Sequence, residues 1–161
     1  MIAKARSLYK KNESKRIEQD AAGYSDRINP DFIRHPAVAR NEETVLGLLI
    51  SYPEHRRLVL ENNSLTEDDF LTDLNKRVFS FVMQNARENN SHSLDFNSEF
   101  SQDEVGRIMR MKISRMELSD NGDEILEQCI ATLKKSVYKE KSKSTDTIAS
   151  LDELLNSKRI N

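Results

Sequence analysis

The sequence is poor in the residues that make tight turns and cross-links. Among its 161 residues there are four Gly, three Pro, one Cys and no Trp. So few turn-forming residues argue against a β-rich fold, and a single Cys cannot form an internal disulfide, which fits a reducing compartment. The composition therefore predicts an all-α protein, and we expect it to be cytoplasmic.

Long apolar runs and a strong charge of one sign are also missing. No run approaches the ~20 apolar residues that a membrane span needs, and charges stand where a signal peptide needs an apolar core. The net charge is −2, so no global field draws the protein to nucleic acid. Lysine-rich runs within residues 1–25 and 134–143 are most simply solvated surface. We expect no membrane association and weak or no direct nucleic-acid binding.

Residues 37–82 carry the most regular pattern in the chain. From Val45 to Tyr52, apolar residues recur at helical spacing, so one side of this predicted helix is buried. Pro53 ends that helix because proline lacks an N–H group, and it suits the first turn of a second helix expected to run to Glu61. The Tyr-Pro-Glu break thus predicts two consecutive helices.

A further helix completes this cluster. Thr66 opens a short capped turn, and Thr72 opens a helix that we expect to run to about Glu88. Beyond it the chain is polar, with two apolar residues, Leu94 and Phe96. We expect both side chains to fold back onto the core.

The remaining sequence predicts helices with clear starts. Ser101 and Glu104 form a capping-box pattern, which predicts a helix to about Met116. A second cap at residues 121–124 opens a long helix with an apolar stripe. The pattern fades in the polar residues after 139, and Ser150 caps what we expect to be one last short helix.

These elements predict one compact multi-helix bundle with a long C-terminal helix and a short final helix. We expect a basic linker or truncated helix at residues 1–25, a compact helical subdomain at 26–118 and a C-terminal helical region at 119–161. Gly47 and Gly106 stand inside predicted helices, where Gly is less favourable than Ala. Close approach between helices is the simplest compensation for both.

No group of residues in the sequence is typical of a catalytic or metal site. His35, His55 and His92 are not spaced for metal binding, and we expect them to be exposed or to cap helices. Cys129 lies on an apolar stripe, so core packing explains it better than nucleophilic chemistry. We expect no catalytic residues, no metal and no cofactor in this chain.

The acidic pairs have a simpler explanation than acid–base chemistry. Residues 42–43, 68–69 and 123–124 fall in or near predicted first helical turns, where negative charge complements the helix dipole. We therefore interpret all three pairs as helix caps.

From Asp26 to its end, the chain resembles the C-terminal, helicase-interacting domain of bacterial DNA primase. The resemblance rests on an acidic start followed by paired leucines and a Pro-Glu, and on later helical segments. The residues that carry it are Asp26-Arg27-Ile28-Asn29-Pro30, Glu42-Glu43-Thr44-Val45-Leu46-Gly47-Leu48-Leu49, Tyr52-Pro53-Glu54, Asn75-Lys76-Arg77-Val78-Phe79 and residues 123–133 and 150–158.

This resemblance implies a docking function. The family domain binds the N-terminal region of the replicative DNA helicase and brings primer synthesis to the replication fork. In some members it also contacts the tail of single-stranded-DNA-binding protein. Residues 1–25 would then be the linker that follows the polymerase core, so the chain would be a fragment that is not itself an enzyme.

The apolar residues near the C-terminal end are our candidates for the helicase contact. They lie in a region whose helical pattern is weak, so they either dock onto a partner helix or fold back onto the core. The candidates are Tyr138, Ile148, Leu151, Leu154 and Leu155.

Two other functions remain open. The N-terminal domain of the replicative helicase shares the acid–leucine pattern, but there a linker and a nucleotide-binding motor would follow. A small helical nucleic-acid-binding protein would use the two lysine-rich runs, and its binding would be strongly salt-dependent because neutralised phosphates release counterions.

Overall fold

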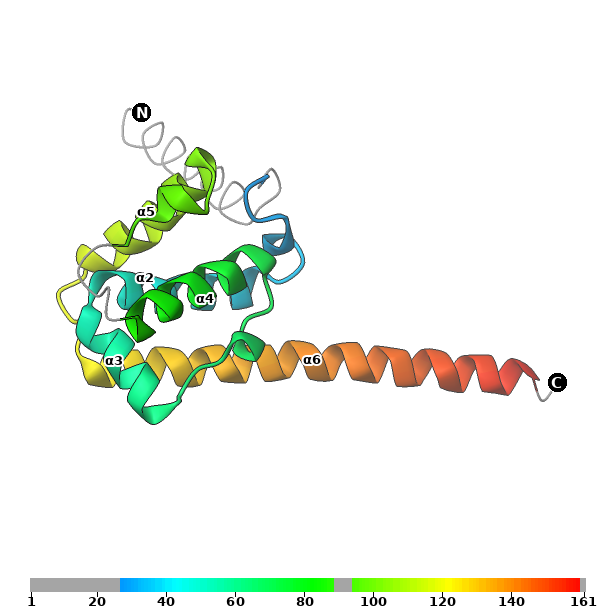
Figure 1. Cartoon of the computed structure of the whole chain (residues 1–161). Helices are drawn as coiled ribbons and strands as arrows, with labels where there is room; N and C mark the ends of the chain where they lie inside the picture. Colours follow the sequence, from blue (N-terminus) through cyan, green and yellow to red (C-terminus); the bar gives the residue numbers. More distant parts are fainter. Residues whose placement is uncertain (1–26, 89–93, 160–161) are drawn as a thin grey trace, which may run out of the picture.

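The computed structural model describes residues 27–88 and 94–159, which contain helices and no strand (Figure 1). The all-α prediction is thus confirmed. The predicted linker at residues 1–25 and His92 lie outside the described residues. In chain order the elements are η1 (Pro30–Phe32), α2 (Pro36–Ser51), α3 (Pro53–Asn62), η2 (Glu67–Asp69), α4 (Asp73–Arg87), η3 (Phe96–Ser98), α5 (Gln102–Met116) and α6 (Asp123–Arg159).

The helix ends follow from local chemistry. Proline occupies the first turn of both α2 and α3, where its missing N–H group costs no hydrogen bond. α3 ends at Asn62, and the next residue, Asn63, adopts the left-handed conformation. Ser101 and Glu104 form the predicted capping box at the start of α5, since each side chain accepts a hydrogen bond from the other residue's N–H group.

α2 is the central helix of the fold. It contacts α3, α4, α5 and α6, and its residues from Val45 to Ile50 are all buried. This part of the helix is apolar on every side and has to lie inside the protein, which explains why its stripe is so wide. Phe96 is buried in the same core and Leu94 packs against it, as predicted.

Gly47 marks the closest approach between two helices. A Cβ atom on Gly47 would lie 2.5 Å from the backbone oxygen of Met111 in α5, so only glycine fits here. The predicted close approach is confirmed at this position. At Gly106 it is wrong, because a Cβ there would meet no atom within 4 Å.

Glu42 does not cap its own helix. Its carboxylate is fully buried and accepts hydrogen bonds at the start of α4: from the N–H groups of Leu71 and Thr72, from Thr72 Oγ1 at 2.6 Å and from Asn75 Nδ2 at 2.9 Å. The prediction of a first-turn cap is wrong because Glu42 lies one turn further into α2, where the fold brings it to α4. Its charge complements the dipole of α4 instead.

α6 is one continuous helix from Asp123 to Arg159. The short final helix expected from Ser150 is therefore wrong, because it is the end of α6. The polar residues after 139 include no Gly or Pro that would end a helix. Their hydroxyls fit within it: Thr145 Oγ1 donates to the carbonyl of Lys141 at 3.0 Å.

α2 and α6 lie antiparallel. His35, just before α2, is 3.2 Å from Glu140 in α6, whereas Tyr52, just after α2, bonds Asn121 at the start of α6. Apolar side chains of α6 up to Val137 join the same core as those of α2 to α5. The division at residue 118 stays a prediction. None of the described helices is long and apolar enough to cross a membrane.

Candidate docking surfaces

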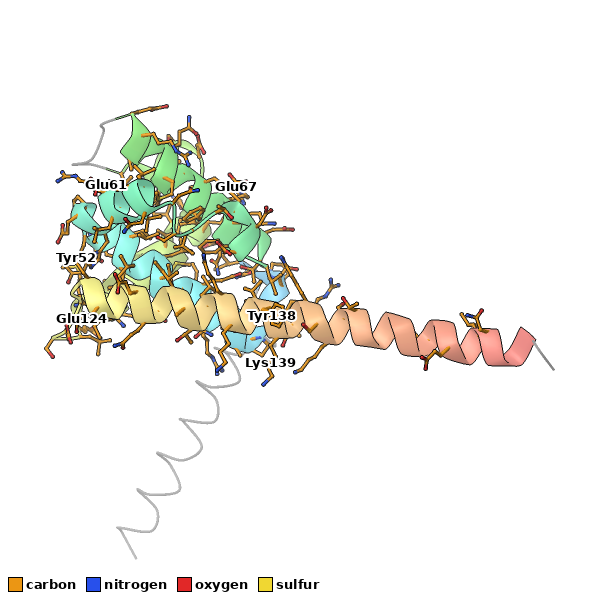
Figure 2. The ribbon with its side chains drawn as sticks, turned by 90° about the horizontal axis from the view of Figure 1, so that it is seen from below. Tyr52, Glu61, Glu67, Glu124, Tyr138 and Lys139 are labelled. Atoms are coloured by element: carbon orange, nitrogen blue, oxygen red, sulfur yellow. The ribbon has the colours of Figure 1, made fainter. Side chains whose placement is uncertain are left out.

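The second half of α6 extends beyond the body of the protein. Figures 1 and 2 show the helix leaving the other elements near Tyr138 and Lys139 and continuing alone. We call residues 123–140 the buried half of α6 and residues 141–159 its free half. Among the described elements, none covers this part of the helix.

Three of the five predicted contact residues have described side chains. Tyr138 is 75 % exposed, Leu151 is 54 % exposed and Leu155 is 59 % exposed, so none of these folds back onto the core. The side chains of Ile148 and Leu154 lie outside the described part. Leu151 and Leu155 are four positions apart and share one face of the helix, whereas Tyr138 lies on another side.

Contacts at the exit point hold α6 against the body. His35 Nδ1 lies 3.2 Å from Glu140 Oε2, Lys141 Nζ donates to the carbonyl of Asp68 at 3.3 Å, and Lys134 Nζ lies 4.0 Å from Asp69 Oδ2. Each exposed contact contributes little by itself, but together they approach α6 from two sides. They fix where the free half begins.

The other end of the buried half is fixed by Asn121. Its Nδ2 donates to the Tyr52 hydroxyl at 3.1 Å, and its Oδ1 accepts two hydrogen bonds from the guanidinium of Arg115. His55 Nε2 donates to the Asn121 carbonyl at 2.6 Å. One asparagine therefore connects the α2–α3 break, the end of α5 and the start of α6.

The surface position expected for His55 is wrong, because only 2 % of it is exposed. His55 lies in the first turn of α3, and the Tyr-Pro break turns that helix so that the ring faces the start of α6. Its contact partner is 66 residues away in sequence. The local pattern could not reveal this burial.

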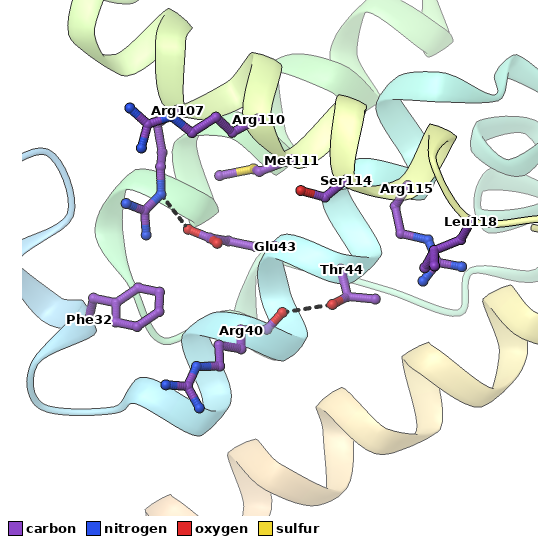
Figure 3. Close-up of a pocket in the computed structure, with 10 residues that line it drawn as sticks. All are labelled: Phe32, Arg40, Glu43, Thr44, Arg107, Arg110, Met111, Ser114, Arg115 and Leu118. Atoms are coloured by element: carbon purple, nitrogen blue, oxygen red, sulfur yellow. Dashed lines mark hydrogen bonds and ion pairs between the residues drawn. The ribbon is translucent and has the colours of Figure 1, made fainter. Parts of the chain in front are cut away.

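A second candidate surface is a cavity of about 520 Å³ between α2 and α5. Figure 3 shows its side chains, which combine four arginines and one glutamate with an apolar floor. Sequence reasoning missed it because the arginines come from distant segments. The residues that line it are Phe32, Arg40, Glu43, Thr44, Arg107, Arg110, Met111, Ser114, Arg115 and Leu118.

The arginines of this cavity differ in their surroundings. Arg107 Nε donates to Glu43 at 2.8 Å and its guanidinium lies over the Phe32 ring, 5.2 Å from the centroid. Arg115 is held by Asn121. Arg40 and Arg110 are exposed at the rim. Positive charge around an apolar floor favours a ligand that carries carboxylates beside an apolar group.

Within the described residues, no group of three or more His, Cys, Asp or Glu could hold a metal ion. Cys129 packs partly buried against the core, as predicted, and this burial raises the pKa of its thiol, although the charge of Arg115 opposes the change. A thiol with a raised pKa is a poor nucleophile.

Compared with known proteins, the chain matches no family model, no curated protein and no solved structure.

Proposed function

We propose that this chain is the C-terminal domain of a bacterial DNA primase, that it is not itself an enzyme, and that it docks onto the replicative DNA helicase. In this role it couples RNA primer synthesis to the replication fork. The observation that supports docking best is the free half of α6, which carries Leu151 and Leu155 exposed and away from the core. The identity of the partner rests on the sequence resemblance alone.

The free half suits helix-mediated docking for a physical reason. An isolated helix of this length is marginal in water, and burial of apolar area is what stabilises most helices in proteins. Leu151 and Leu155 present that area on one face. A groove between helices of the partner is the natural complement to such a face.

The test is co-purification with the replicative helicase of the same organism. The double variant Leu151→Asp with Leu155→Asp removes two apolar contacts, so we expect the Kd to rise by roughly tenfold or more. Circular dichroism and the melting temperature should change little, because both side chains are exposed. Asn156→Asp, which adds a carboxylate to the same helix away from this face, is the matched control and should bind normally.

The result has two informative alternatives. Unchanged binding by the double variant would place the helicase contact elsewhere in the chain. A large loss of helicity in the double variant, with the control intact, would instead mean that the two leucines stabilise the fold.

The cavity between α2 and α5 supports a second contact, with the tail of single-stranded-DNA-binding protein. Its arginines surround an apolar floor of Phe32 and Met111, with the half-exposed Leu118 beside it, which fits a peptide that carries carboxylates beside an apolar side chain. The free half of α6 instead presents two exposed apolar side chains, Leu151 and Leu155. The chain therefore offers one surface for each expected partner.

This second contact is tested with full-length and tail-deleted single-stranded-DNA-binding protein. The double variant Arg40→Glu with Arg110→Glu should abolish tail-dependent binding because it reverses the rim charge. Arg57→Glu changes an exposed arginine on α3 and should bind normally. Tail-independent binding would contradict the proposal. Tight binding of a single-stranded DNA oligonucleotide that weakens steeply with salt would favour the nucleic-acid-binding alternative.

A further inference from the structure

A second hollow, of about 270 Å³, lies between α3 and the buried half of α6, and we call it the α3–α6 groove. Its floor is apolar, because Leu126 and Ile130 are buried there and Leu58 is half-buried. Contacts fix both of its ends. His55 Nε2 donates to the Asn121 carbonyl at one end, and Lys134 Nζ lies 4.0 Å from Asp69 Oδ2 at the other.

The rim of this groove is acidic. Asp123 and Glu127 line it, and both are exposed. From Asp123 to Leu133, α6 carries three acidic residues and no Lys, Arg or His. α3 ends at the groove with Asn62, so the negative end of its dipole adds to this charge. The groove therefore favours a segment that carries cations beside an apolar side chain.

The described part of the chain begins close to the groove. Asn29 Nδ2 donates to Thr72 Oγ1 at 3.3 Å, and Asp31 Oδ2 accepts a hydrogen bond from the N–H group of Asp73 at 3.1 Å. The first described residues thus lie at the start of α4. The preceding element, η2, contacts Lys134 at the near end of the groove.

The residues that precede Arg27 lie outside the described part of the chain, but their sequence has the chemistry that the groove favours. Residues 4–11 carry four cations and no acid, and Leu8 stands between these cations. The other candidate surface would repel such a segment, because four arginines line the cavity between α2 and α5. The cations are Lys4, Arg6, Lys10 and Lys11.

We propose that the α3–α6 groove binds residues 4–11 of the same chain, with Leu8 on its apolar floor and the flanking cations beside Asp123 and Glu127. The contact ties the segment that precedes the helical body to α3 and α6. It involves neither Leu151 nor Leu155, so it is independent of helicase docking.

The length of chain allows this contact. Leu8 is 19 positions before Arg27, which spans ~28 Å if helical and up to ~63 Å if extended. Glu140, beside His35, and Ile130, on the groove floor, are ten positions apart on α6, which is ~15 Å along its axis. A tether this short gives an effective concentration on the order of millimolar, so a contact with a Kd of about 1 mM is already half occupied.

The first test uses the full chain, which contains no Trp, so Leu8→Trp introduces a single fluorophore. We expect its emission to lie at shorter wavelength than in the urea-unfolded chain, and acrylamide to quench it less. Adding Glu127→Lys with Ala131→Lys reverses rim charge and fills the groove. Occupancy should then fall from about half to below about a tenth, with emission close to that of the unfolded chain. Both lysines replace exposed residues, so circular dichroism should not change.

The matched control is Glu124→Lys with Thr132→Lys. It makes the same change in net charge on the same helix, at exposed positions outside the groove, and should leave the emission at the shorter wavelength. A fully exposed tryptophan in the otherwise unchanged chain would overturn the proposal. Equal loss in the control and in the groove variant would also overturn it, because the attraction would then be unspecific.

The second test locates the contact. In a Cys129→Ala background, Leu8→Cys with Ala131→Cys should form a disulfide within one chain faster than Leu8→Cys with Thr132→Cys does, as measured by mass and gel mobility. Equal rates would contradict the geometry. A disulfide between two chains instead would mean that another copy supplies the segment. Helicase binding is assayed separately, so failure here leaves the docking function standing.

Discussion

The backbone oxygen of Met111 lies where a side chain on Gly47 would have to go, because a Cβ atom there would be 2.5 Å from it. The backbones of α2 and α5 therefore meet at this point with no space between them. The Met111 oxygen belongs to the backbone of α5, so no side-chain rotation could make room for a Cβ atom on Gly47. This relationship fixes how closely two of the main helices approach.

Gly47→Ala should destabilise the protein by about 1–3 kcal/mol, because the added methyl group forces α2 and α5 apart. The free energy of unfolding from urea titration followed by circular dichroism measures the effect. Gly106→Ala is the matched control inside α5. Since a Cβ at Gly106 meets nothing within 4 Å, this change should stabilise the protein by about 0.5–1 kcal/mol. Equal effects of the two changes would contradict the close approach at Gly47.

Glu42→Gln should destabilise the protein by about 2–3 kcal/mol, although it removes only a charge. The carboxylate is the acceptor in all four of its hydrogen bonds at the start of α4, whereas an amide would turn an N–H group toward the N–H and hydroxyl donors of Leu71, Thr72 and Asn75. Urea unfolding measures this loss. The matched change Glu127→Gln, on the exposed side of α6, should alter stability by less than about 0.5 kcal/mol. A loss at position 127 as large as that at position 42 would contradict the assignment.

Glu104 should make the stability of the protein sensitive to acid. Its hydrogen bonds with Arg77 and with the N–H group of Ser101 lower the pKa of its carboxyl below the ordinary value. A lowered pKa in the folded state means that the carboxylate contributes stability above the unfolded pKa of about 4.3, and that this contribution is lost as pH falls through the folded value. Melting temperatures of the wild type and of Glu104→Gln should therefore differ at pH 7 and converge at the lowest pH at which both still fold. A difference that persists unchanged into acid would contradict the role of the carboxylate.

Asn121→Ala should loosen the start of α6, because it removes hydrogen bonds to Tyr52, Arg115 and Leu118 at once. We expect a loss of about 1–3 kcal/mol and faster hydrogen exchange in the first turns of α6. Tyr52→Phe removes only one of these bonds and should cost about 0.5–1.5 kcal/mol. If the tyrosine change has the larger effect, Asn121 does not hold this junction.

Much of the fold follows from local pattern. The Tyr-Pro-Glu break, the capping box at Ser101 and the apolar stripes predict α2 to α5 and the start of α6 close to their observed bounds. Each of these signals acts over a few neighbouring residues, so the sequence reveals it directly. The end of α6 was misread because a fading apolar stripe looks like a broken helix. The other helices stop covering α6 there, but its helical backbone continues to Arg159.

The candidate surfaces were predictable only in part. Leu151 and Leu155 were found because apolar residues in a polar region are conspicuous, and both proved exposed. The cavity arginines were not found, since Arg40 and Arg107 meet only when α5 packs across α2. The same holds for His55 and Asn121, whose bond joins segments that are 66 residues apart.

By itself, the sequence determined where each helix begins, where α2 to α5 end and which face of each is apolar, because those properties depend on backbone chemistry and on residue spacing. Only the tertiary structure decided that Glu42 lies buried at the start of another helix and that the arginines surround one cavity. It also decided how far along α6 the other helices pack against it. The first half of α6 joins the core and the second half is exposed because α2 is shorter than α6 and covers only the first half.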